Sequence, residues 1–261
     1  MIIKGSIKQL NKNKQMKKLE NKVALVTGGS RGIGAATVRR LATDGASVAF
    51  TYTSSAEKAE ALANEINASG GRVFAINADS AKAADIINAV NQTVGQFGGL
   101  DILVNNAGTY IGKDFQEHTV EEYDQLMDIN VKAVYVAALE AVKHLKTGGR
   151  IITIGSNMGD NAIGPQTTLY TMSKSALQGF TRGLARDLGP KGITVTLVQP
   201  GPTNTDMNPD NTEKADYLRS RMALQNYGTG EDVAGVVSFL ASEEGKHITG
   251  SWITIDGGFN A

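Results

Sequence analysis

The chain has 261 residues, 41% of them hydrophobic, with 26 basic and 26 acidic side chains and therefore a formal net charge of zero. This length suits one large α/β domain with a sizeable core. The sequence contains no cysteine, which excludes disulfides, thiolate nucleophiles and cysteine-ligated zinc, and its three histidines show no metal-ligand spacing.

The charge is unevenly distributed along the chain. Six lysines and no acid fall in the first 18 residues, so the remainder holds 26 − 6 = 20 basic against 26 acidic residues, a net of −6. The remainder of the chain therefore lacks the excess of basic residues that is typical of nucleic-acid-binding proteins. No apolar run approaches the ~20 residues needed to cross a bilayer. We expect a disordered basic extension over residues 1–18, one domain over residues 19–261, and a soluble cytoplasmic protein that binds neither nucleic acid nor membrane.

Short β-rich apolar segments alternate with segments of helical periodicity along the chain. The predicted strands are residues 23–26, 47–52, 72–76, 100–104, 150–154, 194–198 and 252–255. The predicted helices are residues 33–43, 56–68, 81–96, 120–145, 169–188 and 231–241. This alternation predicts an α/β fold: a single-domain, doubly wound (Rossmann) parallel sheet of about seven strands with helices on both faces. Residues 203–230 predict a loop and short helix over the strand ends, where such sheets bind ligands.

A glycine-rich turn, Thr27–Gly34, follows the first predicted strand. Gly28, Gly32 and Gly34 are spaced as G-x-x-x-G-x-G. Glycines allow the backbone to approach a pyrophosphate closely, and the free N–H groups at a helix start attract it. The turn could also be only a tight strand-to-helix connection. Its place after the first strand of a βαβ unit favours a nucleotide site.

The end of the second predicted strand indicates which dinucleotide binds. An NAD enzyme places an acid there for the ribose hydroxyls, whereas this chain has Thr51-Tyr52-Thr53-Ser54. Arg31, in the glycine turn, could pair with a 2′-phosphate, with hydroxyl hydrogen bonds from Thr53 and Ser54. As a mere solvated cation, Arg31 would be slightly disfavoured at a helix start. We therefore expect NADPH to be preferred over NADH.

Tyr170 and Lys174 form the most informative pair in the sequence. At i and i+4 they share one helix face, so the ammonium can lie beside the phenol and lower its pKa. Ser156 lies fourteen residues upstream. A Tyr and a Lys at this spacing are common on helices, so the pair alone does not establish catalysis.

Further motifs occur in the order typical of one family, and with them the chain from Leu19 to Phe259 resembles the short-chain dehydrogenase/reductases, particularly 3-oxoacyl-carrier-protein reductases. These motifs are Asp79, Asn105-Asn106-Ala107-Gly108, Asn130, Ser156, Tyr170 to Lys174, and Pro200-Gly201 with Thr203 and Thr205. Three departures affect the substrate: the interval from Ser156 to Tyr170 is one residue longer and contains Pro165, Thr203 replaces an Ile or Val, and Gln199 replaces an Asn or Ala.

The resemblance implies a catalytic tetrad and a cofactor site. Ser156 would hold the substrate carbonyl, Tyr170 would donate the proton, Lys174 would lower the phenol pKa and bind the nicotinamide ribose, and Asn130 would bend its helix and hold a relay water. The implied cofactor-binding residues are Gly28, Ser30, Arg31, Gly32, Ile33, Gly34, Thr53, Ser54, Asp79, Asn105, Ala107, Gly108, Tyr170, Lys174, Pro200, Gly201, Thr203 and Thr205.

The predicted function is NADPH-dependent reversible reduction of a ketone to a secondary alcohol, in a homo-oligomer that the resemblance implies is a tetramer. The alternative is a non-enzymatic dinucleotide-binding regulator on the same scaffold, since fold alone does not decide function. An intact Asn130, Ser156, Tyr170 and Lys174 set favours the enzyme. No metal site is expected, and the substrate is expected to be a small or medium carbonyl compound.

Overall fold

The computed structural model describes residues 17–261. The predicted basic extension, residues 1–18, lies outside the described residues except for Lys17 and Lys18. Lys18 pairs with Asp44 at 3.7 Å, and Leu19 is buried, so the residues just before the first strand pack on the domain. Within residues 17–261, none of the helices combines the length and apolar character that crossing a lipid bilayer requires.

Seven parallel strands form one sheet in the order β3-β2-β1-β4-β5-β6-β7, which confirms the predicted fold class. Successive strands lie side by side except where the order reverses between β1 and β4. In such sheets the reversal opens a crevice at the carboxyl ends of the strands. The strands are β1 Val23–Val26, β2 Ser47–Tyr52, β3 Arg72–Asn77, β4 Ile102–Asn105, β5 Arg150–Ile154, β6 Thr194–Pro200 and β7 Ser251–Ile255.

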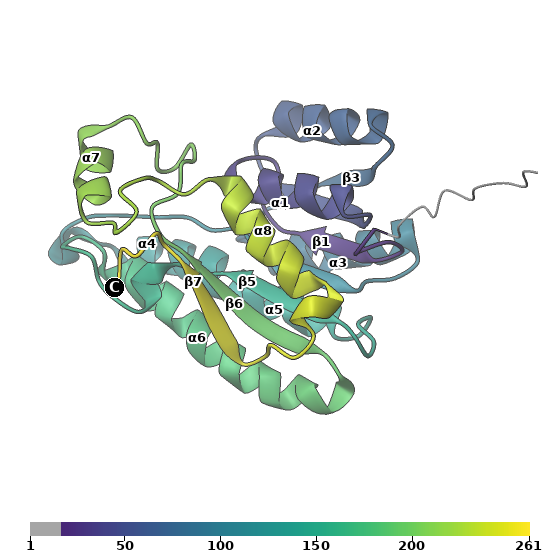
Figure 1. The fold of residues 1–261 in the computed structure, drawn as a ribbon. Helices are drawn as coiled ribbons and strands as arrows, with labels where there is room; N and C mark the ends of the chain where they lie inside the picture. The colour runs from purple at the N-terminus through teal and green to yellow at the C-terminus, as the bar shows by residue number, and fades with distance from the viewer. Residues whose placement is uncertain (1–16) are drawn as a thin grey trace, which may run out of the picture.

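Helices cover both faces of the sheet, as the strand burial requires. Helices α1, α2 and α8 pack on one face, and α3, α5 and α6 pack on the other. Helix α7 stands away from the sheet, beyond the carboxyl ends of β6 and β7 (Figure 1). The helices are α1 Gly32–Thr43, α2 Ala56–Ala68, α3 Ala83–Phe97, α4 Val120–Met127, α5 Ala133–Ala141, α6 Thr168–Leu188, α7 Glu213–Ser220 and α8 Gly230–Ala241.

One predicted helix, residues 120–145, is wrong as a continuous element. A π-helical turn, η2 Asp128–Lys132, separates α4 from α5, which ends at Ala141. Asn130 lies in this turn, and its buried amide bonds both backbone groups of Thr109 and the Ser173 hydroxyl. Apolar periodicity cannot reveal such a turn, because the pattern on either side remains helical. Single π-turns occur frequently at functional sites. The other predicted helix and strand ends agree with the structure within two residues.

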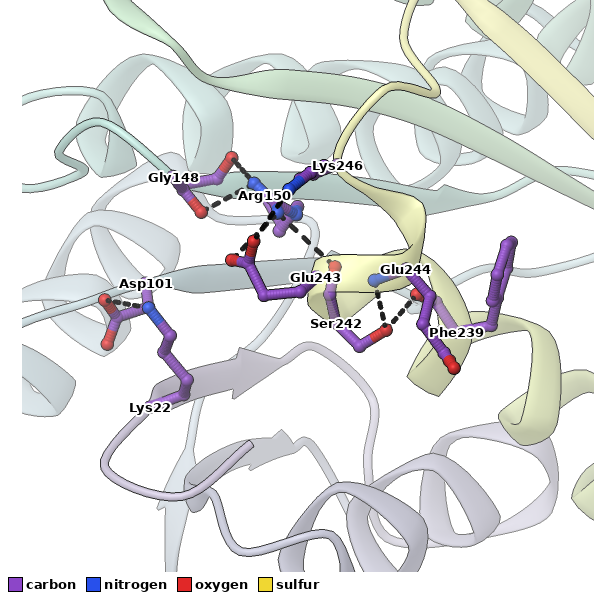
Figure 2. Close-up of polar contacts among 10 residues, drawn as sticks. Lys22, Asp101, Gly148, Arg150, Phe239, Ser242, Glu243, Glu244 and Lys246 are labelled. Carbon is purple, nitrogen blue, oxygen red and sulfur yellow. Dashed lines mark hydrogen bonds and ion pairs between the residues drawn. The ribbon is translucent and has the colours of Figure 1, made fainter. Parts of the chain in front are cut away.

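A buried arginine closes the amino edge of the sheet. Arg150 begins β5 and is 3% exposed. Its guanidinium donates to the carbonyls of Gly148 at 2.7 Å, Gly149 at 3.3 Å and Ser242 at 3.4 Å, and lies 3.9 Å from the Glu243 carboxylate (Figure 2). These contacts tie the loop before β5 to the segment after α8. Protein groups therefore pair most of the guanidinium at this edge, whereas Arg150 Nε has no hydrogen-bond partner among residues 17–261.

Candidate active site

A cavity of about 950 Å³ lies along the carboxyl edge of the sheet. Its walls come from the turns after β1 to β6 and from α7, a position typical of ligand sites in doubly wound sheets. It brings together the predicted residues Gly28, Ser30, Arg31, Gly32, Ile33, Gly34, Thr53, Ser54, Asp79, Ala107, Gly108, Ser156, Tyr170, Lys174, Pro200, Gly201, Thr203 and Thr205. Of the predicted site residues, Asn105 and Asn130 are not among the described cavity walls.

The glycine turn has a backbone that only glycine tolerates well. Gly28 and Gly32 have φ of +64° and +51°, in the left-handed region. A Cβ on Gly34 would lie 2.2 Å from the Gly28 carbonyl oxygen. Asn106 braces the turn, because its amide donates to the carbonyls of Thr27 and Gly28 at 2.9 Å each. The turn leads into α1, whose N-terminus faces the cavity with free N–H groups and a partial positive charge.

Two cations converge on one carboxylate at the adenosine end predicted for the cavity. Lys58 Nζ lies 3.1 Å from Asp206 Oδ2, and Arg31 NH1 lies 3.6 Å from the same oxygen. These cations, Lys58 first, hold the pKa of Asp206 below its usual value. Lys58 is not among the residues that line the cavity, and sequence reasoning did not predict its place beside Arg31. The available signal was a lysine in the first turn of a helix that starts at the sheet's carboxyl edge, where the helix dipole disfavours a cation.

The end of β2 offers hydroxyls and no carboxylate. Thr53 and Ser54 are exposed and line the cavity, and Thr53 donates to the Ala78 carbonyl at 3.1 Å. Asp79, after β3, also lines the cavity, and its carboxylate accepts from the Ala81 N–H at 3.0 Å. This part of the cavity therefore carries Arg31 and the two hydroxyls, with the carboxylates of Asp79 and Asp206 nearby.

Tyr170 and Lys174 lie on α6 with Ser156 opposite them. Lys174 is 4% exposed, and its Nζ donates to the Ile154 carbonyl at 3.1 Å and lies 5.5 Å from the centre of the Tyr170 ring. Ser156 is the residue before the short helix η3, Asn157–Gly159, and its Oγ accepts from the Met158 N–H at 3.1 Å. The β5 end and the α6 face thus present a hydroxyl, a phenol and an ammonium to one cavity.

Burial dominates the protonation of this group. It raises the pKa of Tyr170 to about 12, with the Ser156 hydrogen bond opposing and the nearby Tyr110 adding to the shift. It lowers the pKa of Lys174 to about 8. The expected lowering of the phenol pKa by Lys174 and a cationic nicotinamide ring stays a prediction, since in the protein alone burial sets the pKa of Tyr170 and the Lys174 ammonium faces the Ile154 carbonyl. Tyr170 is a protonated donor at neutral pH.

Asn130 does not line the cavity but hydrogen-bonds residues next to it. Its Oδ1 accepts from the Thr109 N–H at 2.8 Å, and its Nδ2 donates to the Thr109 carbonyl at 3.0 Å and to Ser173 Oγ at 3.1 Å. A Cβ on Gly108 would lie 3.5 Å from Asn130 Oδ1 and 3.6 Å from Lys174 Nζ. Asn130 therefore joins the segment after β4 to α6, close to the lysine.

Asn105 has a different place. It is 2% exposed in β4, and its amide points to Thr153 Oγ1 of the next strand at 3.4 Å. It supports the sheet beneath the cavity, whereas its neighbour Asn106 lines the cavity. After β6, Thr203 lines the cavity too and donates to the Gly201 carbonyl at 3.0 Å.

The other end of the cavity is apolar and aromatic. The Tyr110 ring meets the Tyr170 ring edge-on with centres 5.1 Å apart. The lengthened segment after Ser156 forms the rim, where Gln166 adopts φ +62° and its carbonyl accepts from the Tyr110 hydroxyl at 3.3 Å. Apolar lining comes from Met158, Ile163, Met207, Leu218 and Phe259. Tyr110 and Phe259 were not predicted, because isolated aromatics carry no sequence signal for a cavity.

Among residues 17–261, no group of three or more Asp, Glu or His side chains is arranged to hold a metal ion. The catalytic groups that the cavity itself presents are a phenol, an ammonium and a hydroxyl.

Known proteins share both the sequence and this fold. The family model described as enoyl-(acyl carrier protein) reductase matches residues 28–260. A solved short-chain dehydrogenase from Burkholderia cenocepacia, in complex with NADP, is 52% identical, covers 94% of this chain and 100% of its own, and superposes with a TM-score of 0.92.

Two curated relatives have different names. The cyclic-di-GMP-binding biofilm dispersal mediator protein of Escherichia coli is 47% identical over 240 residues, 92% of this chain and 98% of the relative. A probable tetrahydroxynaphthalene reductase of Zymoseptoria tritici is 39% identical over 253 residues, 92% of this chain and 95% of the relative. These matches span nearly the whole described fold. The chain belongs to the short-chain dehydrogenase/reductase family and is an oxidoreductase of the NAD(P)-dependent type.

Proposed function

We propose that the protein reduces a ketone to a secondary alcohol with NADPH, reversibly, and that Tyr170 donates the proton. The observation that carries this proposal is the meeting of Ser156, Tyr170 and Lys174 at one cavity that also contains the glycine turn. These groups are what carbonyl reduction needs: a hydrogen bond to the carbonyl oxygen, a proton donor and a nearby cation.

The cavity residues fit a dinucleotide. The glycine turn leaves space where a Cβ would clash, and the α1 N-terminus provides N–H groups for a pyrophosphate. Arg31 and Lys58 already share one anionic group, the Asp206 carboxylate, so they form an anion site that a 2′-phosphate could take over. Together with the lack of an acid after β2, this supports NADPH over NADH. The NADP in the Burkholderia cenocepacia structure supports the same choice.

Bound NADPH supplies the hydride that adds to the carbonyl carbon. As it does so, Tyr170 transfers its proton to the carbonyl oxygen, and Ser156 Oγ holds that oxygen in place. Lys174, as an ammonium, stabilises the phenolate that remains on Tyr170. We assign Asn130 the role of keeping α6 and the segment after β4 in register, and of connecting Lys174 to solvent through a water.

The experiment is a panel of ketones, diketones and β-keto thioesters, followed by NADPH oxidation and by identification of the product alcohol. Wild type should convert at least one class stoichiometrically with NADPH. A protein that binds NADPH but reduces none of these compounds would contradict the proposal.

The cavity favours a small or medium, largely apolar carbonyl compound. Tyr110, Met207, Leu218 and Phe259 would surround it, and the tetrahydroxynaphthalene reductase among the relatives supports including aromatic ketones in the panel. Met222 and Leu224, two other residues of the 203–230 segment, are not among the described cavity walls. Met222 packs with Phe259 in a small apolar cluster instead.

A second candidate is a nucleotide-binding regulator without turnover. It is supported by the E. coli relative, which is named for binding cyclic di-GMP. Against it stand the three reacting groups at the cavity, which a regulator would not require. Calorimetric titration with cyclic di-GMP, with and without NADPH, separates the two: tight binding without any ketone reduction would favour the regulator.

We also propose a homo-oligomer, and a tetramer as the family resemblance implies. Its support is an exposed apolar surface on α4 and α5, including Tyr123, Tyr135 and Leu139, since exposed apolar patches often mark interfaces. Sedimentation at micromolar protein concentration tests this, and a monomer would contradict it.

A further inference from the structure

Next to the active site, one carboxylate and two side-chain amides form a closed ring of hydrogen bonds. Gln178 Nε2 donates to Asp160 Oδ1 at 2.6 Å and to Gln199 Oε1 at 2.9 Å. Gln199 Nε2 donates to the other oxygen, Asp160 Oδ2. The carboxylate accepts twice, Gln178 donates twice, and Gln199 does one of each. We call these three residues the Asp160 ring.

Each member comes from a segment that supplies the active site. Asp160 directly follows η3, the short helix that Ser156 precedes. Gln178 lies four residues after Lys174 on the same face of α6. Gln199 is the residue before Pro200, where β6 enters the turn that lines the cavity. The ring therefore links the hydroxyl, the phenol–ammonium pair and the β6 turn through one carboxylate.

Two further contacts show how closely η3 is held on α6. The Ser175 hydroxyl donates to the Gly159 carbonyl at 2.8 Å, and a Cβ on Gly159 would lie only 3.2 Å from the Lys174 carbonyl oxygen. Gln199 is completely buried, and it stands where the resemblance leads one to expect Asn or Ala. Its longer side chain reaches the carboxylate after η3 from β6.

We propose that the Asp160 ring positions Ser156 against Tyr170, with Gln199 as the buried member that sets its geometry. Ser156 directly precedes η3 and Asp160 directly follows it, so a shift of the ring moves the hydroxyl relative to α6. Misplacing a reacting group by about 1 Å can cost ~100-fold in rate. The three are positioning residues, and the inference rests on the proposed ketone reduction.

The ring contributes less to stability than to placement. Asp160 is exposed and Gln178 is partly exposed, so water can replace their mutual hydrogen bond when one partner changes. The net value of a hydrogen bond between accessible groups is small. Loss of the ring should therefore reduce turnover without a matching loss of melting temperature.

The test exchanges the donor and acceptor roles within the ring. Asp160→Asn replaces one of the two oxygens that accept in the ring with an NH2 donor, and Gln178→Glu places two carboxylates together. Either single variant should lower kcat about tenfold. The double variant Asp160→Asn/Gln178→Glu restores the balance of donors and acceptors in the ring. The carboxylate introduced at 178 accepts twice and the amide introduced at 160 donates twice. The Gln199 amide rotates by about 180°, so that it still donates once and accepts once.

We expect the double variant to recover at least half of the wild-type kcat, with the Kd for NADPH unchanged in all three variants. Gln96→Glu is the matched control, because it makes the same amide-to-carboxylate change at an exposed site on α3. Single variants that keep the control's kcat, a double variant no faster than the slower single, or losses of kcat that follow melting temperature would each overturn the proposal.

Amide hydrogen exchange of the peptide covering residues 155–160 tests whether the Asp160 ring holds this segment, and it needs no substrate. Exchange should be faster in each single variant and return to the wild-type rate in the double variant. If wild type reduces no ketone, the proposed function fails while this measurement still judges the ring. Exchange that does not change in the single variants would overturn it.

Discussion

The two edges of the sheet both bury charged side chains, but they do so differently. At the amino edge, Arg150 is enclosed by backbone carbonyls and Glu243 (Figure 2). At the carboxyl edge, Lys174 is equally buried, yet its Nζ has a single protein hydrogen bond, to the Ile154 carbonyl, and faces a cavity. An ammonium has three donors. A buried charge paired mainly by protein groups indicates structure, although Arg150 Nε has no partner among the described residues, whereas spare donors at a cavity indicate a ligand.

From this difference we expect the amino edge to serve stability and the carboxyl edge to serve catalysis. Changes at the carboxyl edge should alter kinetic constants with little loss of stability, and changes at the amino edge should do the reverse. The predictions below test that division.

The largest effect is expected from Tyr170→Phe. Loss of the phenolic proton donor should lower kcat at least ~100-fold, while the Kd for NADPH stays close to wild type, because the hydroxyl lies away from the glycine turn. Steady-state kinetics and fluorescence titration measure the two constants. A variant that keeps more than about a tenth of the wild-type rate would refute Tyr170 as the donor.

At the other edge, Arg150→Met should lower the free energy of unfolding by about 2–4 kcal/mol, because the carbonyls of Gly148, Gly149 and Ser242 lose a charged donor. Thermal and urea denaturation measure this loss. Arg150→Lys keeps the charge but not the planar set of donors. Its free energy of unfolding should therefore fall between that of wild type and that of Arg150→Met. At 25 °C the kcat of both variants should match wild type; a tenfold fall in kcat would break the division between the edges.

Cofactor preference should respond to the cations at the adenosine end. Arg31→Ala removes a charge-assisted contact worth ~1.5–3 kcal/mol, so the KM for NADPH should rise roughly ten- to a hundredfold and that for NADH should hardly change. Thr53→Asp should shift preference towards NADH. Equal losses for both cofactors in Arg31→Ala would show that Arg31 serves only the shared pyrophosphate or the fold.

Asp206→Asn should change the KM for NADPH in the opposite direction to Arg31→Ala. The Asp206 carboxylate contacts both Arg31 and Lys58, so removing its charge should free them for a 2′-phosphate and lower the KM for NADPH a few-fold. The effect should diminish with added salt. A higher KM for NADPH would show that Asp206 organises the cations rather than competing for them.

The smallest effect at neutral pH concerns Lys174. Burial lowers its pKa to about 8, so the ammonium is present below that pH and is lost above it. The ammonium stabilises the phenolate left by proton transfer, so kcat/KM for ketone reduction should be level up to about pH 7 and fall about tenfold per unit above pH 8. A flat profile from pH 6 to 10 would contradict this role.

The sequence predicted the sheet well because buried parallel strands are short, apolar and separated by helical segments. Most of the predicted site residues also lie at the cavity, because the glycine turn and the Tyr170–Lys174 spacing impose local geometry. Apolar periodicity missed the π-turn around Asn130, although the family resemblance implied a bend of the helix there. That turn depends on hydrogen bonds to Thr109 and Ser173, which are distant in sequence.

Other features depend on where loops fold back. Lys58 and Asp206 are 148 residues apart, and nothing local indicates that they pair. Asn105 and Asn106 are adjacent at the end of β4, and nothing in the sequence distinguishes them. In the structure Asn105 points into the sheet and Asn106 lines the cavity. The raised pKa of Tyr170 reflects burial by the surrounding fold, which the i, i+4 spacing does not reveal.

Transfer of deuteride from NADPH that carries deuterium at both C4 positions tests the central claim most directly. After incubation with the best ketone of the panel, mass spectrometry should find one deuterium on the carbinol carbon of the alcohol made by wild type. Tyr170→Phe should bind the cofactor equally well and form almost none of this product. An alcohol without deuterium, or equal product from the variant, would contradict hydride transfer at the carboxyl edge with Tyr170 as the proton donor.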